Sequence, residues 1–505
     1  MTALTDILQG ERVGQHRPWP RLAVTPQTWR AVADALAAGR AALLGLWGDA
    51  GAVPMVHMAI MDASAGDIAV VSVACTDGTF PSVGAVHPPA IRLERAIHSL
   101  YGLQPTGAPD ARPWLDLGFW DVQYPLGARQ PAPAERPAYA FLPVEGDSLH
   151  QIPVGPVHAG IIEPGHFRFT AGGETIVRLE QRLGYVHKGI DSLMAGATIE
   201  RAAKLAARTS GDSTVAYGIA FARAVEAALN VEAPPRAQHI RGLMAELERL
   251  ANHFGDIGAI CNDASFSLMH AHCGVLRELV LRAAVACFGH RLMMDRVIPG
   301  GVACDLASDG ANLIGKTLQD ASRRFAELIE LYDNTASLQD RTAGTGIVSA
   351  ELARQFAAPG YVGRASGRNF DARKTPAYPP YDRLDFSVPV LTAGDVNARV
   401  WMRIREVEQS IALIGQILDS LPDGPIANPI AGGSGSGEGL ALVEGFRGDV
   451  LAWLRLEDMR VERCHLRDPS WLQWPLLEAA IEGNIVADFP LCNKSFNCSY
   501  SGHDL

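Results

Sequence analysis

The stretch PPRAQHIRGLMAELERLANHFGDIGAI, residues 234–260, decides the fold class of this chain. Its apolar side chains recur every three or four residues, at Ile240, Leu243, Met244, Leu247, Leu250, Phe254 and Ile257. This spacing places them on one face of an α-helix, and the two prolines at the start suit its first turn. Residues 311–332 and 395–421 repeat the pattern. Several long amphipathic helices in one region predict a helix-bundle core.

Upstream of the helical region, residues 1–124 have the pattern of a small α+β unit. Apolar runs separated by Gly and Asp predict strands at 41–48, 52–61 and 67–75, and a helix is expected at 89–103. The proline-rich stretch 125–143 follows and predicts an extended connector. We therefore expect an α+β protein with an N-terminal domain (1–124), a linker (125–143) and a mainly helical domain (144–505) that opens with a β-hairpin around Gly172–Gly173.

Composition excludes several classes of protein. The net charge of −11 argues against nucleic acid as the main partner, and no apolar run reaches the length of a membrane span. The N-terminus has no signal-peptide pattern. The eight cysteines are scattered without a C-x-x-C pair, so this chain is not expected to bind an iron–sulfur cluster by itself.

Two stretches give only weak signals of a site. The Gly-rich GGSGSGEG, 432–439, lacks the Lys of a phosphate-binding loop and is interpreted as a turn-forming loop. In HAHC, 270–273, the two histidines diverge on a helix, so ordinary packing is the preferred interpretation. The tail holds Cys492 and Cys498, which could meet only through an unusual turn, and no metal site is expected there.

Two other stretches are stronger candidates. GPVHAGIIEPGHFRF, 155–169, places His158 and His166 around a Gly/Pro-rich loop, where binding residues are common. RTSGDSTVAYG, 208–218, places Asp212 between Ser210 and Ser213 just before an apolar helical run. Without further context the second stretch is interpreted as a helix start whose polar side chains cap free amides.

The stretches GPVHAGIIEPGHFRF (155–169), RLGYVHKGID (182–191), TAGTGIVSAE (342–351), 236–263 and 381–411 resemble the large subunit of group 4, energy-converting nickel–iron hydrogenases of the formate-hydrogenlyase type. They resemble equally the quinone-module large subunit of respiratory complex I. Residues 94–120 are similar to the C-type subunit of complex I, which some of these hydrogenases carry fused ahead of the large subunit. The resemblance covers nearly the whole chain.

The resemblance implies a pair of thiolate motifs, R-x-C-G-x-C and C-x-x-C, that hold nickel and iron. In this chain the first motif begins at Arg208 and has Ser210 and Ser213 at its cysteine positions, and the second has Cys498 and Ser501. A serine hydroxyl is a poor substitute for a soft thiolate ligand. We therefore expect no nickel–iron centre and no other metal site. The maturation step that removes a C-terminal extension is not expected either, because the sequence stops at Leu505.

The complex I resemblance implies a quinone site instead. His158 and His166 match the histidine positions of its quinone loop, whereas the tyrosine position is occupied by Gly211. Asp191 stands where the family has a proton-carrying glutamate, so Asp191 and Asp212 are the expected acid–base residues. Quinone is the expected acceptor, with Arg208, Ser210, Ser213, Cys498 and Ser501 around it.

The resemblance further implies partners and a location. We expect a small iron–sulfur subunit that carries a 4Fe-4S cluster, and antiporter-like membrane subunits that hold the chain on the cytoplasmic side of the inner membrane. Three functions remain open: electron transfer to a quinone coupled to ion translocation, a non-catalytic coupling scaffold, and an active nickel–iron hydrogenase. No dinucleotide fingerprint is present, so NADH is not expected to bind this chain directly.

Overall fold

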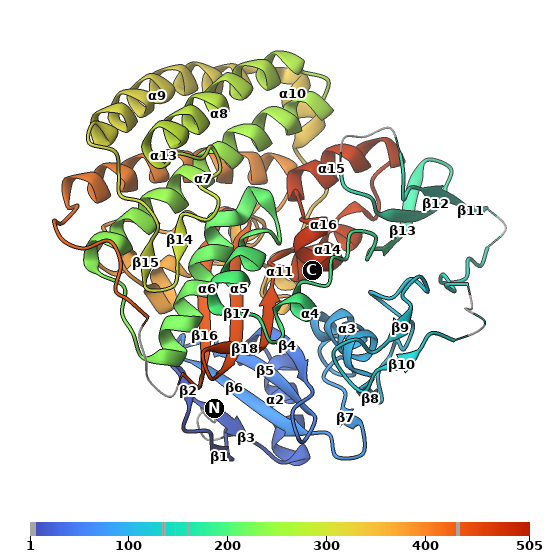
Figure 1. Ribbon diagram of the computed structural model, residues 1–505. Helices are drawn as coiled ribbons and strands as arrows, with labels where there is room; N and C mark the ends of the chain where they lie inside the picture. The colour runs from blue at the N-terminus through green and yellow to red at the C-terminus, as the bar shows by residue number, and fades with distance from the viewer. Residues whose placement is uncertain (1–6, 134, 136–137, 147, 159–161, 431–434) are drawn as a thin grey trace.

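The computed structural model describes residues 7–133, 135, 138–146, 148–158, 162–430 and 435–505. The stretch that decided the fold class forms the long helix α7 (Pro235–Asp263), with proline in its first turn. All seven apolar positions of its predicted face are buried. The other two predicted long helices are α9 (Gly310–Asn334) and α13 (Val396–Asp419), and α8 (Ser267–Phe288) runs beside them (Figure 1). The predicted helical layer is confirmed.

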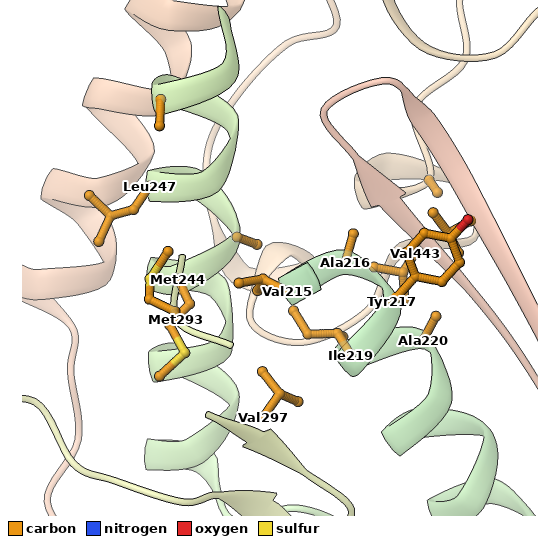
Figure 2. Packing of buried hydrophobic residues seen from close by; sticks show 14 of the residues in the cluster. Val215, Ala216, Tyr217, Ile219, Ala220, Met244, Leu247, Met293, Val297 and Val443 are labelled. Atoms are coloured by element: carbon orange, nitrogen blue, oxygen red, sulfur yellow. The ribbon is translucent and has the colours of Figure 1, made fainter. Parts of the chain in front are cut away.

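Helix α6 (Thr214–Leu229) lies between this helical layer and a sheet. Figure 2 shows Val215 and Ile219 extending toward Met244 of α7, while Tyr217 lies against Val443 of β16. All five side chains are at most 3% exposed and belong to one continuous core. Because α6 is apolar on both sides, it fixes the position of the segment just before it, residues 208–213.

The sheet against α6 has the strand order β18-β17-β16-β2. Its antiparallel strands are β16 (Gly437–Gly445), β17 (Gly448–Glu457) and β18 (Arg460–Arg467). The fourth strand, β2 (His16–Arg17), comes from the N-terminal region and pairs in parallel with β16. The N-terminal region therefore contributes directly to a sheet of the C-terminal region.

The N-terminal region has its own five-stranded sheet in the order β1-β3-β6-β5-β4. Its strands are β1 (Glu11–Arg12), β3 (Arg21–Ala23), β4 (Ala41–Asp49), β5 (Met55–Asp62) and β6 (Ile68–Ala74). Helices α2 (Pro26–Ala37) and α3 (Ile91–Tyr101) pack beside it. The three predicted strands and the predicted helix are confirmed, as is the α+β class.

The predicted hairpin is confirmed as β12 (His166–Gly172) and β13 (Thr175–Arg182), with β11 (Leu149–Val154) as a third strand. Gly173 in its turn has φ +60°, a conformation that glycine adopts without strain. The proline-rich stretch contains the short strand β10 (Gln130–Pro131), and its residues 134 and 136–137 lie outside the described residues. Residues 432–434 of the Gly-rich loop, and residue 431 before it, also lie outside them. The predicted division at 125–143 stays a prediction.

The remaining short elements complete the chain. The helices are α4 (Ile190–Met194), α5 (Ile199–Ala207), α10 (Ala336–Thr342), α11 (Ala350–Gln355), α12 (Gly360–Ala365), α14 (Ser470–Ile481), α15 (Phe489–Phe496) and α16 (Tyr500–Asp504). The 3-10 and π turns are η1 (Pro88–Ala90), η2 (Gly211–Ser213), η3 (Arg373–Ala377), η4 (Tyr381–Arg383) and η5 (Val486–Asp488). The short strands are β7 (Thr79–Pro81), β8 (Gln104–Thr106), β9 (Val122–Gln123), β14 (Val297–Ile298) and β15 (Gly301–Val302).

Candidate functional site

Three segments that are far apart in the sequence meet beside the N-terminal end of α6. They are the turn η2 between α5 and α6, the turn between β16 and β17, and the residues just before α16. Together they form a group that we call the Asp212–Arg447 cluster, made of Ser210, Asp212, Ser213, Arg447 and Ser499.

Asp212 and Arg447 form a bidentate ion pair at the centre of the cluster. Arg447 Nη1 donates to Oδ1 at 2.9 Å and Nη2 donates to Oδ2 at 2.5 Å. The Ser210 and Ser213 hydroxyls also donate to Oδ1, at 2.7 and 3.2 Å. Burial alone would raise the pKa of Asp212, but the charge of Arg447 and these hydrogen bonds lower it to about 2. Asp212 is therefore ionised at neutral pH, and 34% of its side chain stays exposed.

The last helix contributes a hydroxyl to the cluster through Ser499. Its Oγ lies 3.2 Å from Ser210 Oγ and accepts a hydrogen bond from the N–H of Gly502 at 2.9 Å. Ser499 is thus the N-cap of α16, and the cap fixes the hydroxyl next to Ser210. Ser501 was the residue predicted from the motif. Its backbone N–H donates to Glu163 Oε2 at 3.1 Å, so the motif position and the residue that meets Ser210 differ by two.

Cys498 is the predicted thiol next to this cluster. It is 5% exposed, and its Sγ lies 3.9 Å from the Gln473 amide oxygen, to which it donates. Burial raises its pKa far above the ordinary range of a thiol. The group is therefore a neutral thiol.

These donors do not fit a nickel–iron centre. Ser210 and Ser213 stand at two of the thiolate positions, and they direct their hydroxyl protons to Asp212. Soft, ionised sulfur ligands are what such a centre requires. Within the described part of the chain, no group of three His, Cys, Asp or Glu side chains could hold a metal ion.

Arg208 lies apart from the cluster. Both of its terminal nitrogens donate to Asp295, at 2.6 Å each, and 44% of its side chain is exposed. The pairing explains the direction of the side chain, because Asp295 offers a carboxylate at the surface while Arg447 already neutralises Asp212. The structure thus separates Arg208 from Ser210, although they are two residues apart in the sequence.

Asp191 also contacts a different set of residues. It lies in the first turn of α4 and is 6% exposed, with Oδ2 3.9 Å from Nδ1 of His465 on β18. Its other oxygen, Oδ1, is buried and has no hydrogen-bond partner among the described residues. This places Asp191 beside the C-terminal sheet, with His465 as its ion-pair contact there.

The two predicted histidines flank a loop that reaches α16. His166, in β12, places Nδ1 3.2 Å from the Gly155 carbonyl oxygen, and burial lowers its pKa. His158 is half-buried near Gly155, and residues 159–161 of the loop lie outside the described residues. At the far end of the loop, a Cβ on Gly165 would lie 2.8 Å from the Tyr500 ring, so loop and helix are in close contact. The loop is therefore adjacent to the element that carries Ser499.

Sequence reasoning missed three residues of this site, Arg447, Ser499 and Glu248. Glu248 on α7 accepts hydrogen bonds from the N–H groups of Val215 and Ala216 at 2.7 and 3.1 Å, and Asn252 Nδ2 donates to the Asp212 carbonyl oxygen at 2.7 Å. Burial, with a further contribution from the charge of Asp212, raises the pKa of Glu248 to about 8. A narrow cavity between these residues has room for about one water molecule.

One of the three missed residues had a signal in the sequence. Glu248 falls within the apolar face of α7, four residues after Met244 and one after Leu247, and a carboxylate at a core position is unusual. Arg447 stands in the turn between two strands, in GFRGD, where nothing in the local pattern distinguishes it from an ordinary turn residue.

The comparisons with known proteins agree on one family. The sequence profile described as the 49 Kd subunit of respiratory-chain NADH dehydrogenase matches residues 264–432. The chain is 32% identical over 438 residues to formate hydrogenlyase subunit 5 of Escherichia coli K12, which covers 84% of this chain and 77% of that protein. It is 33% identical to the carbon monoxide-induced hydrogenase of Rhodospirillum rubrum, over 69% of this chain and 98% of the relative.

A third relative belongs to the other branch. The C/D subunit of the NADH-quinone oxidoreductase of Phocaeicola vulgatus is 28% identical, over 81% of this chain and 83% of its own length. The name of this relative combines a C and a D subunit. This agrees with the expectation that one chain here resembles both a C-type and a D-type subunit of complex I.

Proposed function

The chain belongs to the family of group 4 hydrogenase large subunits and complex I 49-kDa-type subunits and is a subunit of an oxidoreductase complex, and from that premise we propose how it acts. It accepts electrons from a 4Fe-4S cluster of a neighbouring small subunit and passes them to a quinone or a similar acceptor. Antiporter-like membrane proteins of the same complex couple this reaction to ion translocation. No nickel–iron centre takes part.

The observation that supports this proposal is the chemistry of the Asp212–Arg447 cluster. Hydroxyls stand at both positions of the first thiolate motif, and they donate to a carboxylate that is itself paired with a guanidinium. Such a group offers a guanidinium cation and hydroxyls rather than sulfur ligands. The carbonyl oxygens of a quinone accept hydrogen bonds, and a guanidinium can donate them.

Reduction of a quinone to a quinol takes up two electrons and two protons. The electrons come from the partner subunit, and the two protons come from solvent and are relayed by side chains of this chain. Glu248, with its pKa of about 8, is near the pH at which a group both holds and releases a proton efficiently. Arg447 stabilises negative charge that develops on the acceptor oxygens.

The proposed location follows from the partners. No helix in the ranges that the structure describes is both long and apolar enough to cross a membrane. The chain is thus proposed to associate peripherally with the cytoplasmic face of the inner membrane, through the membrane proteins of its complex.

A second candidate function, a non-catalytic scaffold that couples the peripheral and membrane parts, is favoured by one observation. The cavity beside Asp212 and Glu248 has room for about one water molecule and is too narrow for a quinone ring as it stands. The access that remains is through the side chain of Asp212, 34% of which is exposed.

The test compares quinone-analogue reduction by the purified complex with wild-type chain and with Asp212→Asn. We expect at least a tenfold fall in turnover for Asp212→Asn, with the iron–sulfur signal of the partner unchanged in electron paramagnetic resonance. The matched control is Asp320→Asn, whose carboxylate is 35% exposed and pairs with Arg324 on α9, and it should keep full activity. Equal turnover in all three proteins would support the scaffold instead.

A further inference from the structure

A cavity of about 530 Å³, lined by none of the residues of the Asp212–Arg447 cluster, lies between the N-terminal sheet and the segment that follows α10. One wall is mainly apolar and comes from α2 and strands β4 and β5, with Leu36, Ala37, Ala41, Ala42 and Met61. The opposite wall is polar and comes from α11 and the segment after α12, with Ser349, Arg354, Gln355, Arg368 and Asn369. Sites for small molecules have volumes of about 300–1,000 Å³ and a similar mixture of surfaces.

Arg368 gives this cavity its chemical character. Its Nη1 donates to the Ala358 carbonyl oxygen at 3.0 Å, and its guanidinium lies 4.2 Å from the centre of the Phe370 ring. No carboxylate of the described residues lies within 4.0 Å of the Arg368 guanidinium, which is the longest distance counted as an ion pair. Most of its N–H donors therefore have no protein acceptor in the described part of the chain.

The electrostatic surroundings do not replace a missing counter-ion. Burial lowers the pKa of Arg368 to about 10, and the charges of Arg364 and Arg467 act in the same direction. The charges of Asp449 and Glu444 act in the opposite direction, with larger effects than those of the two arginines, but they do not outweigh the effect of burial. The neighbouring Arg364, by contrast, pairs with Glu406 at 2.7 Å and with Glu444 at 2.9 Å. A partly desolvated guanidinium without such a pair is stabilised by an anion that reaches it.

We propose that this cavity binds a small organic anion, with its carboxylate or phosphate on Arg368 and its apolar body against Leu36 and Met61. Exposed Arg354 adds a second positive charge at the rim, where Glu351 is the one carboxylate among the described lining residues. The ligand would contact both the N-terminal sheet and the helices of the C-terminal region, and so hold the two regions together.

The experiment uses the purified full chain and titrates it calorimetrically with two probe anions, hexanoate and phenyl phosphate, and with hexan-1-ol as an uncharged comparison. We expect saturable binding of at least one anion, with weaker binding of the alcohol. Arg368→Gln should weaken the binding of that anion at least tenfold. The control Arg383→Gln, which removes an arginine that is 75% exposed and outside the cavity, should leave it unchanged.

A second variant keeps the test decisive if Arg368→Gln does not fold. Ala37 is exposed at the end of α2 and lines the cavity, so Ala37→Phe narrows it without disturbing the core. It too should weaken binding. The proposal is overturned if neither anion binds saturably, or if both cavity variants bind as tightly as the wild-type chain. Neither result depends on electron transfer, so this test and that of the proposed function can fail separately.

Discussion

Asp212 is a carboxylate whose charge depends on a partner 235 residues away in the sequence, Arg447. The substitution Asp212→Asn removes this negative charge and leaves the buried guanidinium of Arg447 without its counter-ion. A fully buried pair would lose about 3–5 kcal/mol, but solvent reaches a third of this side chain, so we expect a loss of about 1–2 kcal/mol in the free energy of unfolding.

Urea unfolding of the wild-type chain and Asp212→Asn measures this difference. Because the pKa of Asp212 is lowered from 3.8 to about 2, the stabilisation is present above pH 3.8 and is lost as the pH falls toward 2. The control Asp320→Asn, in an exposed pair on α9, should leave the free energy of unfolding nearly unchanged. An Asp212→Asn loss no greater than that of the control would show that the ion pair does not stabilise the fold.

The contribution of Glu248 to the free energy of unfolding should depend on pH in the opposite direction. Its pKa is raised from 4.5 to about 8, so the folded chain keeps a proton that the unfolded chain has already released. This contribution to stability is complete below pH 4.5 and is lost as the pH rises through about 8. Compared with Glu248→Gln, the wild-type chain should therefore lose more than about 1 kcal/mol over this interval.

The measurement is urea unfolding of both proteins at several pH values between the two pKa values. Glu327→Gln, at a position on α9 that is 74% exposed, serves as the control and should follow the wild-type curve. Parallel curves for the wild-type chain and Glu248→Gln would contradict the raised pKa.

The candidate site could be predicted only in part from the sequence. The motif RTSGDS located Ser210, Asp212 and Ser213, because these residues lie within one turn. Arg447 and Ser499 could not be found in this way, since tertiary packing alone brings the β16–β17 turn and the end of the chain to η2. Arg208 was expected at the same site from its place in the motif, but a surface carboxylate, Asp295, is its partner.

At the scale of elements, Gly242 allows helix α7 to pack closely against Pro380. A Cβ on Gly242 would lie 2.7 Å from Pro380 Cγ and 3.0 Å from its Cδ, and the proline ring cannot rotate away. Gly242→Ala should therefore destabilise the chain by about 1–3 kcal/mol, although alanine is the better helix former.

The matched control is Gly415→Ala in α13, where a Cβ would meet nothing within 4 Å. It should stabilise the chain by up to about 1 kcal/mol, because only the helix propensity changes. Thermal unfolding of the two variants gives the comparison. A stabilised Gly242→Ala would mean that α7 and the segment of Pro380 do not approach as closely as described.

The long helices and the strands of the N-terminal sheet were predictable because their apolar spacing is regular over many residues. The short elements around the site were not. The turn η2 and helix α16 have three and five residues, too few for a period to be recognised, and they are fixed by caps such as Ser499 and by contact with α6.

At the scale of the whole molecule, the N-terminal region is joined to the rest more closely than its sequence suggested. Strand β2 pairs with β16, and Trp47 of β4 stacks on His465 of β18 with ring centres 5.2 Å apart. Asp49 and Arg455 add an ion pair of 2.6 Å between the same two sheets. Sequence patterns report local periodicity and cannot show that two sheets share one core.

The central claim is that this protein works in its complex without a nickel–iron centre, and elemental analysis of the purified, active complex tests it most directly. Iron should be present from the partner's cluster while nickel stays far below one atom per chain, and the complex should reduce a quinone analogue. Nickel at one atom per chain, together with hydrogen uptake that is lost on Cys498→Ala, would contradict the account.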